Sequence, residues 1–140
     1  MNDLKQKILD KMKDPTLASF ATVTEDNRPW VRYVVAWADD QLSIWFATFK
    51  SSRKVKQIEA NPDVHLTLGV TDLAKAASWI QVQGQAHILE DADTKKRTWY
   101  DMLEAIFNGP EDPNYVVCRV KPYRIEYYTM NRKMPEVLEI

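Results

Sequence analysis

The pattern of apolar and polar positions predicts a protein built mainly from β-strands. Apolar and β-branched residues gather in short runs, and turn-forming segments such as residues 25–29 and the pair Asp39 and Asp40 separate them. Runs that follow one another so closely indicate an antiparallel meander, which we expect to close into a small barrel rather than form an open sheet. The predicted strands are residues 17–24, 30–38, 42–48, 64–70, 78–89, 115–121 and 124–129.

Three further segments have the apolar spacing of amphipathic helices. The first ends before Pro15, and the second covers residues 54–60 and ends before Pro62. The third covers residues 93–107 and has apolar residues at i, i+3, i+4, i+7 and i+8, which we interpret as core packing. Those apolar residues are Trp99, Met102, Leu103, Ile106 and Phe107. The tail from Asn131 onward has no informative pattern.

The composition indicates one domain that spans residues 1–140. The chain has 140 residues, of which 45% are hydrophobic, so it can bury one core of ordinary size. Its 19 basic and 20 acidic residues nearly cancel, which argues against binding to nucleic acid or to a membrane through bulk charge. The single cysteine, Cys118, excludes an intramolecular disulfide, and no apolar run is long enough to span a membrane. We therefore expect a cytoplasmic protein.

The residues present exclude several common kinds of catalytic site. His65, His87 and Cys118 lie in separate predicted strands, so their spacing gives neither a zinc site nor a Cys–His nucleophile pair. The whole chain has three glycines, too few for the glycine-rich phosphate loops of nucleotide-binding folds. Any chemistry should therefore belong to a cofactor, and a phosphate would have to be held by side chains.

The turn between the third predicted strand and the second helix carries an unusual set of charges. Ser51 and Ser52 precede Arg53 and Lys54, although the partial positive charge of a helix N-terminus favours acidic residues there. Free backbone N–H groups, hydroxyls, a guanidinium and an ammonium together suit a phosphate. The alternative is a serine-capped helix whose basic residues are simply solvated, and the pattern alone leaves both interpretations open.

The polar face of the longest predicted strand is a second candidate for a functional surface. Trp79 and His87 share this face with three glutamines at every second position, opposite the apolar residues of the strand. A polar but uncharged face suits a wet cavity, the edge of a cofactor, a subunit contact or open solvent.

The order of these motifs resembles the pyridoxamine 5'-phosphate oxidase-like family of FMN-binding split barrels. The run from Phe107 to Pro113 further resembles the bacterial general stress protein subgroup of that family. Together the motifs cover residues 17–129. The residues of the second strand, the third strand and the basic turn that carry the resemblance are Arg32, Tyr33, Val34, Thr48, Ser52, Arg53 and Lys54.

The resemblance implies a mainly β fold, namely a six-stranded antiparallel split β-barrel with α-helices. It further implies a homodimer that binds FMN in clefts between its subunits, with the phosphate held by Arg32 and the basic turn. Thr48 would contact the phosphate or the ribityl chain, and the backbone of the second strand would meet the flavin ring. Trp79 lies where family members reach the flavin from the partner strand. The implied cofactor-binding residues are Arg32, Tyr33, Val34, Thr48, Ser51, Ser52, Arg53, Lys54 and Trp79.

The leading hypothesis is an FMN-dependent oxidoreductase with a small-molecule substrate that the sequence does not identify. The alternative is a stress protein that stores or senses FMN without turnover. A third hypothesis is a nucleic-acid-binding barrel with Trp30, Tyr33 and Trp45 as stacking platforms, and the near-neutral charge argues against it. Oxidation of pyridoxamine phosphate is not expected, because this chain lacks the C-terminal basic pattern of those enzymes and has Trp37 where they have a lysine.

Overall fold

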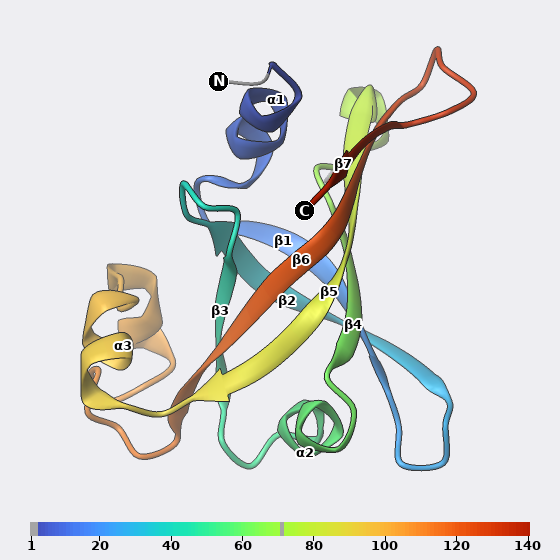
Figure 1. Ribbon diagram of the computed structural model, residues 1–140. Coiled ribbons are helices and arrows are strands. Elements are labelled where there is room, and N and C mark those ends of the chain that lie inside the picture. The colour runs from blue at the N-terminus through green and yellow to red at the C-terminus, as the bar shows by residue number, and fades with distance from the viewer. Residues whose placement is uncertain (1–2, 71) are drawn as a thin grey trace.

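The fold is a closed antiparallel barrel, described by a computed structural model for residues 3–70 and 72–140 (Figure 1). The neighbouring strands follow the order β3-β2-β1-β4-β5-β6-β7, and an additional β3–β6 pairing closes β1 to β6 into the expected six-stranded barrel. The strands are β1 (Thr16–Val23), β2 (Pro29–Ala38), β3 (Ile44–Phe49), β4 (Asp63–Leu68), β5 (Ser78–Leu89), β6 (Tyr115–Thr129) and β7 (Glu136–Glu139). The helices are α1 (Asp3–Met12), α2 (Arg53–Ala60) and α3 (Ala92–Arg97), with 3₁₀ helices η1 (Leu73–Lys75) and η2 (Asp101–Ala105).

Strand β3 joins the barrel mainly through β6, and this leaves a split beside β2. β3 pairs with β6 at every position from Ile44 to Phe49. Within the described residues it pairs with β2 only where Trp37 meets Trp45 and Ala38 meets Ile44. The two strands therefore separate along β2 towards its N-terminal end, and one edge of β2 is left open there.

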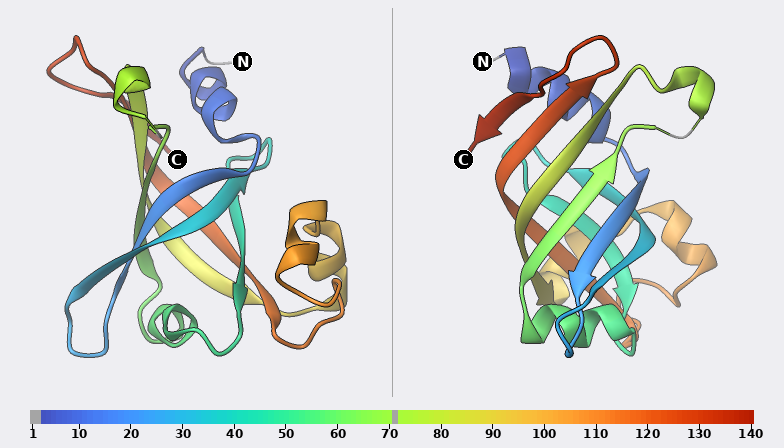
Figure 2. Two further views of the ribbon diagram at one scale, coloured as in Figure 1. Left: turned by 180° about the vertical axis from the view of Figure 1, so that it is seen from behind. Right: turned by 90° about the vertical axis from the view of Figure 1, so that its right-hand side faces the viewer.

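A large hydrophobic cluster fills the barrel, and two helices cover its ends. The rings of Phe20 and Phe46 meet edge to face inside it, with centroids 4.8 Å apart. Helix α1 covers one end with Ile8 and Met12, and α2 covers the opposite end with Ile58 (Figure 2). Complete burial of such side chains stabilises a fold by about 1.5 to 3 kcal/mol each.

A second, smaller cluster lies on the outside of the barrel, where α3 and η2 cover β3 and β6 (Figure 2). Its Tyr115 ring lies 5.4 Å from the Trp99 ring and 5.1 Å from the Phe107 ring. This cluster fixes η2 beside the split between β2 and β3. Its buried residues are Trp45, Leu103, Phe107, Tyr115 and Val117.

The prediction of one continuous helix over residues 93–107 is wrong, because α3 ends at Arg97 and η2 begins separately. Asp91 caps α3 by accepting a hydrogen bond from the Thr94 backbone N–H at 2.9 Å. The Thr98 hydroxyl donates to the Thr94 carbonyl oxygen at 2.8 Å, and side-chain bonds of this kind compete with a continuing helix. The backbone at Tyr100 is extended, which turns the chain before η2.

The break divides the apolar stripe that was predicted to be core. Leu103 and Phe107 are buried against the outer cluster. Met102 and Ile106 remain 52% exposed each, so the prediction that they pack in the core is wrong. They face the split in the barrel instead.

The two strands predicted for residues 115–121 and 124–129 are one continuous strand, β6. Pro122 lies opposite Gly84 of β5, and the next paired position joins Arg124 to Gln83, so Tyr123 is the extra residue of a β-bulge. Proline has no backbone N–H to donate to the neighbouring strand. A bulge tolerates it because the ladder of hydrogen bonds is interrupted there.

The tail that had no pattern forms a seventh strand, β7, on the free edge of β6. Its four residues pair with Arg124 to Tyr127. Ion pairs support the pairing, since Arg124 contacts Glu139 at 2.7 Å and Lys7 of α1 contacts Glu136 at 3.2 Å.

Candidate functional site

The basic turn begins α2 close to the predicted position, with Ser52 as its N-cap. The Ser52 hydroxyl accepts a hydrogen bond from the Lys54 backbone N–H at 3.3 Å, and the Ser52 backbone N–H donates to the Phe49 carbonyl at 3.0 Å. Ser51 is exposed in the turn. The first turn of α2 contains no acidic residue, so the positive end of the helix is left uncompensated by its own sequence.

Lys54 reaches back from α2 to the end of β3. Its Nζ donates to the Thr48 hydroxyl at 2.7 Å and to the Ser52 hydroxyl at 3.1 Å. Burial lowers the pKa of Lys54, and the positive charge of Arg32 lowers it further. Two of the three hydroxyls predicted to lie at the phosphate, those of Thr48 and Ser52, therefore lie at the tip of this lysine.

Arg32 points towards the end of the barrel that α2 covers. Its Nη1 donates to the Thr22 hydroxyl at 2.7 Å, and its Nη2 donates to Gln57 Oε1 at 2.9 Å. The Thr22 hydroxyl also donates to Gln57 Oε1, at 2.6 Å, so the three side chains form a closed triangle. Burial lowers the pKa of Arg32, and the charge of Arg53 lowers it further.

The three cations of this cluster have no carboxylate partner. In residues 3–70 and 72–140, no ion pair includes Arg32, Arg53 or Lys54. Arg53 lies over the Trp30 ring, with its Cζ atom 5.4 Å from the ring centroid. Lys50 of the same basic run points elsewhere and contacts Glu90 at 2.8 Å. Like charges held together in this way favour the binding of an anion.

A cavity of about 220 Å³ opens beside the cluster, in the split between β2 and β3. Lys54 is the only charged residue in its lining, and η2 forms the wall opposite the two strands. The predicted residues Tyr33 and Val34 line it along the open edge of β2, and Thr48 lines it from β3. The remaining lining residues are Val35, Ala47, Phe49, Tyr100, Met102, Leu103, Ile106 and Phe107.

Trp79 does not join the cation cluster of the same chain. Its ring stacks on Tyr128 at 5.5 Å, on the outer face of β5 and β6. It lines a different cavity of about 260 Å³, together with Leu17 of β1 and Tyr33 of β2. Tyr33 borders both cavities and is the only predicted site residue that connects the two regions.

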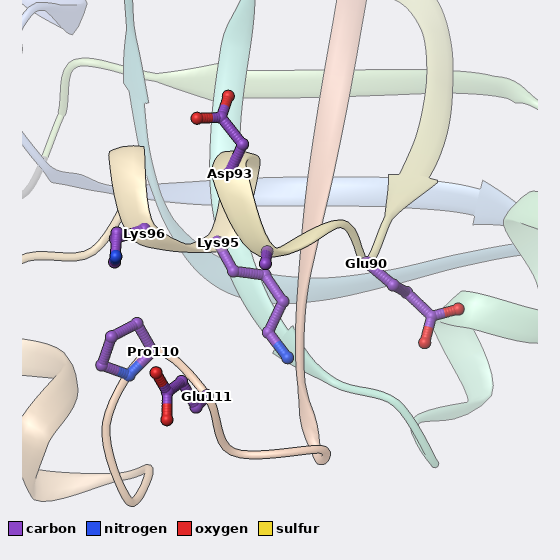
Figure 3. Close-up of a pocket in the computed structure, with 7 residues that line it drawn as sticks. Glu90, Asp93, Lys95, Lys96, Pro110 and Glu111 are labelled. Atoms are coloured by element: carbon purple, nitrogen blue, oxygen red, sulfur yellow. The ribbon is translucent and has the colours of Figure 1, made fainter.

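A hollow of about 330 Å³ beside α3 lies apart from these residues (Figure 3). Lys95 extends along it, but its Nζ donates to the Asp112 backbone carbonyl at 2.9 Å. Glu90, at the rim, is the partner of Lys50. Its lining mixes both signs of charge, and Glu90, Asp93 and Lys95 have partners within the protein, so we do not assign a ligand to it.

The described residues contain no group of three or more histidine, cysteine, aspartate or glutamate side chains that could hold a metal ion. Among the helices that the structure describes, none has the length and apolar character needed to cross a membrane.

Sequence reasoning missed the residues that position Arg32 and those that form the cavity wall. Thr22 and Gln57 are ordinary polar residues in the sequence. A signal for Thr22 existed, since the hairpin between β1 and β2 places it diagonally across from Arg32 on the same face. The assumption of one unbroken helix placed Met102 and Ile106 in the core, so their position at the cavity was not predicted.

Comparisons with known proteins agree with one another. The family described as pyridoxamine 5'-phosphate oxidase matches residues 4–129 of this chain. General stress protein 26 of Bacillus subtilis (strain 168) is 35% identical over 138 residues, which cover 99% of this chain and 97% of that protein. A pyridoxine/pyridoxamine 5'-phosphate oxidase of Aeromonas hydrophila is 28% identical over 109 residues, which cover 78% of this chain and 46% of the enzyme. The chain therefore matches about half the length of that oxidase.

The similarity extends to a solved structure of nearly the same length. The crystal structure of the General Stress Protein 26 from Bacillus anthracis str. Sterne superposes with a TM-score of 0.83 at 31% sequence identity. The match covers 99% of this chain and 100% of the other.

Proposed function

Because the chain belongs to the pyridoxamine 5'-phosphate oxidase family, which is of the FMN-binding type, we propose that its three unpaired cations hold the phosphate of FMN. The observation that carries the proposal is the cluster of Arg32, Arg53 and Lys54 without a carboxylate partner in the described residues. The phosphate of FMN carries nearly two negative charges. Hydrogen bonds to charged groups contribute about 1.5 to 3 kcal/mol each, so three of them contribute about 4.5 to 9 kcal/mol before ordering costs, and the upper end of that range corresponds to micromolar binding.

The residues present fit the cofactor. Thr48 and Ser52 hold the Lys54 ammonium, and the triangle of Arg32 with Thr22 and Gln57 holds the guanidinium. The open edge of β2 at Tyr33 and Val34 offers backbone groups to the flavin ring, and η2 forms the opposite wall of the cavity. FMN would supply hydride and electron transfer there, and the protein would act as an oxidoreductase.

We further propose that the protein is a homodimer and that each flavin site lies between two subunits. The support is a row of exposed apolar residues on the outer face of β2, formed by Val31, Tyr33 and Val35. Leu17 of β1 extends the row, since it pairs with Val35. Contiguous apolar surface of this kind marks an interaction site. In such a dimer Trp79 would reach the flavin of the partner subunit, as the family resemblance implies.

The phosphate-binding role is tested by comparing FMN with riboflavin, which lacks the phosphate. The double variant Arg53→Ala plus Lys54→Ala should weaken FMN binding by about a hundredfold or more, because it removes two charge-assisted interactions. Riboflavin binding should change by less than about threefold, since the lost residues contact the phosphate and not the ring. Flavin fluorescence titration measures both affinities.

The matched control is Lys50→Ala, which removes a charge from the same basic run. Lys50 contacts Glu90 and not the cluster, so FMN affinity should be unchanged. Equal losses of FMN and riboflavin affinity in the double variant would refute the proposed phosphate site.

The alternative function is the storage or sensing of FMN without turnover. It is favoured by the full-length similarity to General stress protein 26, together with a match to only 46% of the pyridoxine/pyridoxamine 5'-phosphate oxidase. The two functions differ in the rate at which NADH or NADPH reduces the bound flavin. A rate above that of free FMN supports the oxidoreductase, and a rate no higher than that of free FMN supports the alternative.

A further inference from the structure

Gln57 of α2 contacts Arg32 through a side chain that carries no charge. Its Oε1 atom accepts from Arg32 Nη2 at 2.9 Å and from the Thr22 hydroxyl at 2.6 Å. The same hydroxyl accepts from Arg32 Nη1 at 2.7 Å. The oxygen of the amide must face Arg32, because a guanidinium can only donate hydrogen bonds. Arg32 is therefore held by two neutral acceptors, at a position where a glutamate would form an ion pair.

The internal contacts of Arg32 leave one edge of its guanidinium for a ligand. Nη1 also donates to the backbone carbonyls of Phe20 at 3.3 Å and Trp30 at 3.2 Å, so both of its N–H groups are engaged. Nη2 donates to Gln57, and in the part of the chain that the structure describes neither its second N–H nor the Nε–H has an acceptor. Thr22 and Gln57 together occupy the edge between the two Nη atoms, because their oxygens are in contact. The free N–H groups then lie on the edge between Nε and Nη2, which suits two parallel hydrogen bonds to a phosphate.

The neutrality of Gln57 keeps the charge of Arg32 available to a ligand. A carboxylate at the same place would pair with Arg32 from inside the protein and leave only Arg53 and Lys54 uncompensated. A phosphate monoester is doubly charged above about pH 6 and singly charged below it. Three uncompensated cations favour the doubly charged form, because each Coulomb interaction is proportional to the charge of the ligand.

The other charged groups around Gln57 do not compensate the cluster. Glu25 and Asp26 of the turn between β1 and β2 border a hollow of about 290 Å³ beside Gln57, and Lys56 lines the same hollow. Both carboxylates are exposed, and Asp26 pairs with Arg28 at 3.0 Å. Water and salt screen exposed charges, so these groups act on the cluster only weakly.

We propose that Gln57 makes the cation cluster selective for a phosphate monoester in its doubly charged form. Gln57 acts through Arg32 and is a positioning residue, which orients the guanidinium without consuming its charge. The proposal rests on the proposed function, because it requires that the cluster holds the phosphate of FMN.

The first test is Gln57→Glu, which keeps the shape and the acceptor oxygen of the side chain and adds one negative charge. FMN affinity at about pH 7 should fall by about tenfold or more, because the carboxylate competes with the phosphate for Arg32. Riboflavin affinity should change by less than about threefold. The FMN-free variant should unfold at a higher urea concentration than wild type, because Arg32 gains a partner for its charge. Damage to packing would instead lower affinity and stability together.

Gln41→Glu is the matched control, because it makes the same chemical change at an exposed position far from the cluster. Gln41 lies in the turn between β2 and β3, at the end of the barrel opposite α2 (Figure 1). The FMN affinity of this variant should equal that of wild type.

The second test is the pH dependence of the ratio between FMN and riboflavin affinities. In wild type the ratio should fall by about tenfold between about pH 7 and about pH 5, as the phosphate takes up its second proton. In Gln57→Glu the fall should be smaller, because fewer uncompensated cations distinguish the two forms of the phosphate. Flavin fluorescence titration at each pH measures both affinities.

The outcomes separate this inference from the function on which it rests. If wild type binds FMN no more tightly than riboflavin, the proposed phosphate site fails and the inference fails with it. If wild type prefers FMN but Gln57→Glu keeps that preference, or if the wild-type ratio does not change with pH, only the inference is overturned. A loss of both stability and FMN affinity in Gln57→Glu would assign Gln57 a packing role and would also overturn it.

Discussion

At the residue scale, Lys54 shows a conflict between binding and stability. Its ammonium is half buried between two hydroxyls, near the guanidinium of Arg32, and both burial and that neighbouring charge lower its pKa. A group whose charged form is disfavoured in the folded state reduces the stability of the protein without ligand. Phosphate binding stabilises the charged form of Lys54, because the anion offsets the unfavourable effects of burial and of the Arg32 charge.

This conflict predicts a specific pH dependence for the FMN-free protein. The pKa of Lys54 in the folded state lies below its usual value of 10.5, so between the two values the unfolded chain binds more protons. The free energy of unfolding must then rise with pH in that interval. At pH values below the interval Lys54 is charged in both states, so the full destabilising cost of the buried charge remains. The difference in this free energy, wild type minus Lys54→Met, should therefore increase as the pH rises towards 10.5, the usual pKa of lysine. Urea unfolding at several pH values measures it.

Lys50 supplies a control with the opposite sign. Its hydrogen bond with Glu90 raises the pKa of Lys50, so its contribution to stability is present below the unfolded value and is lost as pH rises through the folded value. The difference between wild type and Lys50→Met should not increase with pH. A flat or falling difference for Lys54→Met would contradict the electrostatic account of the cluster.

Sequence alone predicted the charged part of this site and missed its supports. Arg53 and Lys54 were recognisable because basic residues at a helix start oppose the helix dipole. No such anomaly marks Thr22 or Gln57 in the sequence. They hold Arg32 through a triangle of hydrogen bonds, and the two residues are 35 positions apart in the chain. Residues that act by holding another residue become visible only when the fold brings them together.

At the scale of elements, the β-bulge in β6 depends on one glycine in β5. A Cβ atom added at Gly84 would lie 2.7 Å from the Lys121 carbonyl oxygen and 2.9 Å from a methyl group of Val120. The first of these atoms belongs to the backbone and cannot rotate away. The close approach lets the strand continue past Pro122. The sequence pattern alone had predicted that one strand ends and another begins at this proline.

The bulge therefore predicts a large cost for a small substitution. Gly84→Ala should lower the free energy of unfolding by about 1 to 3 kcal/mol, because the added methyl group overlaps the facing strand. Gln83→Ala, at an exposed position one residue earlier, should change it by less than about 0.5 kcal/mol. Urea unfolding of both variants measures the difference, and equal stabilities would show that the two strands separate here at no cost.

The elements that sequence reasoning misjudged share a physical cause. The break before η2 follows from the Thr98 hydroxyl, which bonds to Thr94 and also to the Tyr115 hydroxyl across the outer cluster. Strand β7 forms because β6 has a free edge and ion pairs hold the tail to it. Both outcomes are decided by contacts with β6 rather than by local spacing. The strands from β1 to β5 were predictable, because the alternation of apolar and polar residues along them indicates directly which face is buried.

At the scale of the whole molecule, the closed barrel leaves one apolar surface uncovered. The inward faces of the strands are buried in the core, but on the outer face of β2 Val31 is 63% exposed and Tyr33 is 72% exposed. Exposed β-branched and aromatic residues in one row cost free energy in water and favour association. A second copy of the chain related by a twofold axis would bury the same row on both subunits.

This surface predicts that a single charge disrupts the proposed dimer. Val31→Lys should convert a species of twice the chain mass of 16.3 kDa into one of the chain mass, as measured by light scattering. Val31 lies outside the cation cluster and the cavity lining, so the fold should persist, which circular dichroism checks. Leu73→Lys is the matched control, because Leu73 is also an exposed apolar residue but lies in η1 and not in the row on β2. A wild-type protein of single chain mass would refute the homodimer, and loss of FMN binding together with dimerisation in Val31→Lys would support a flavin site shared between subunits.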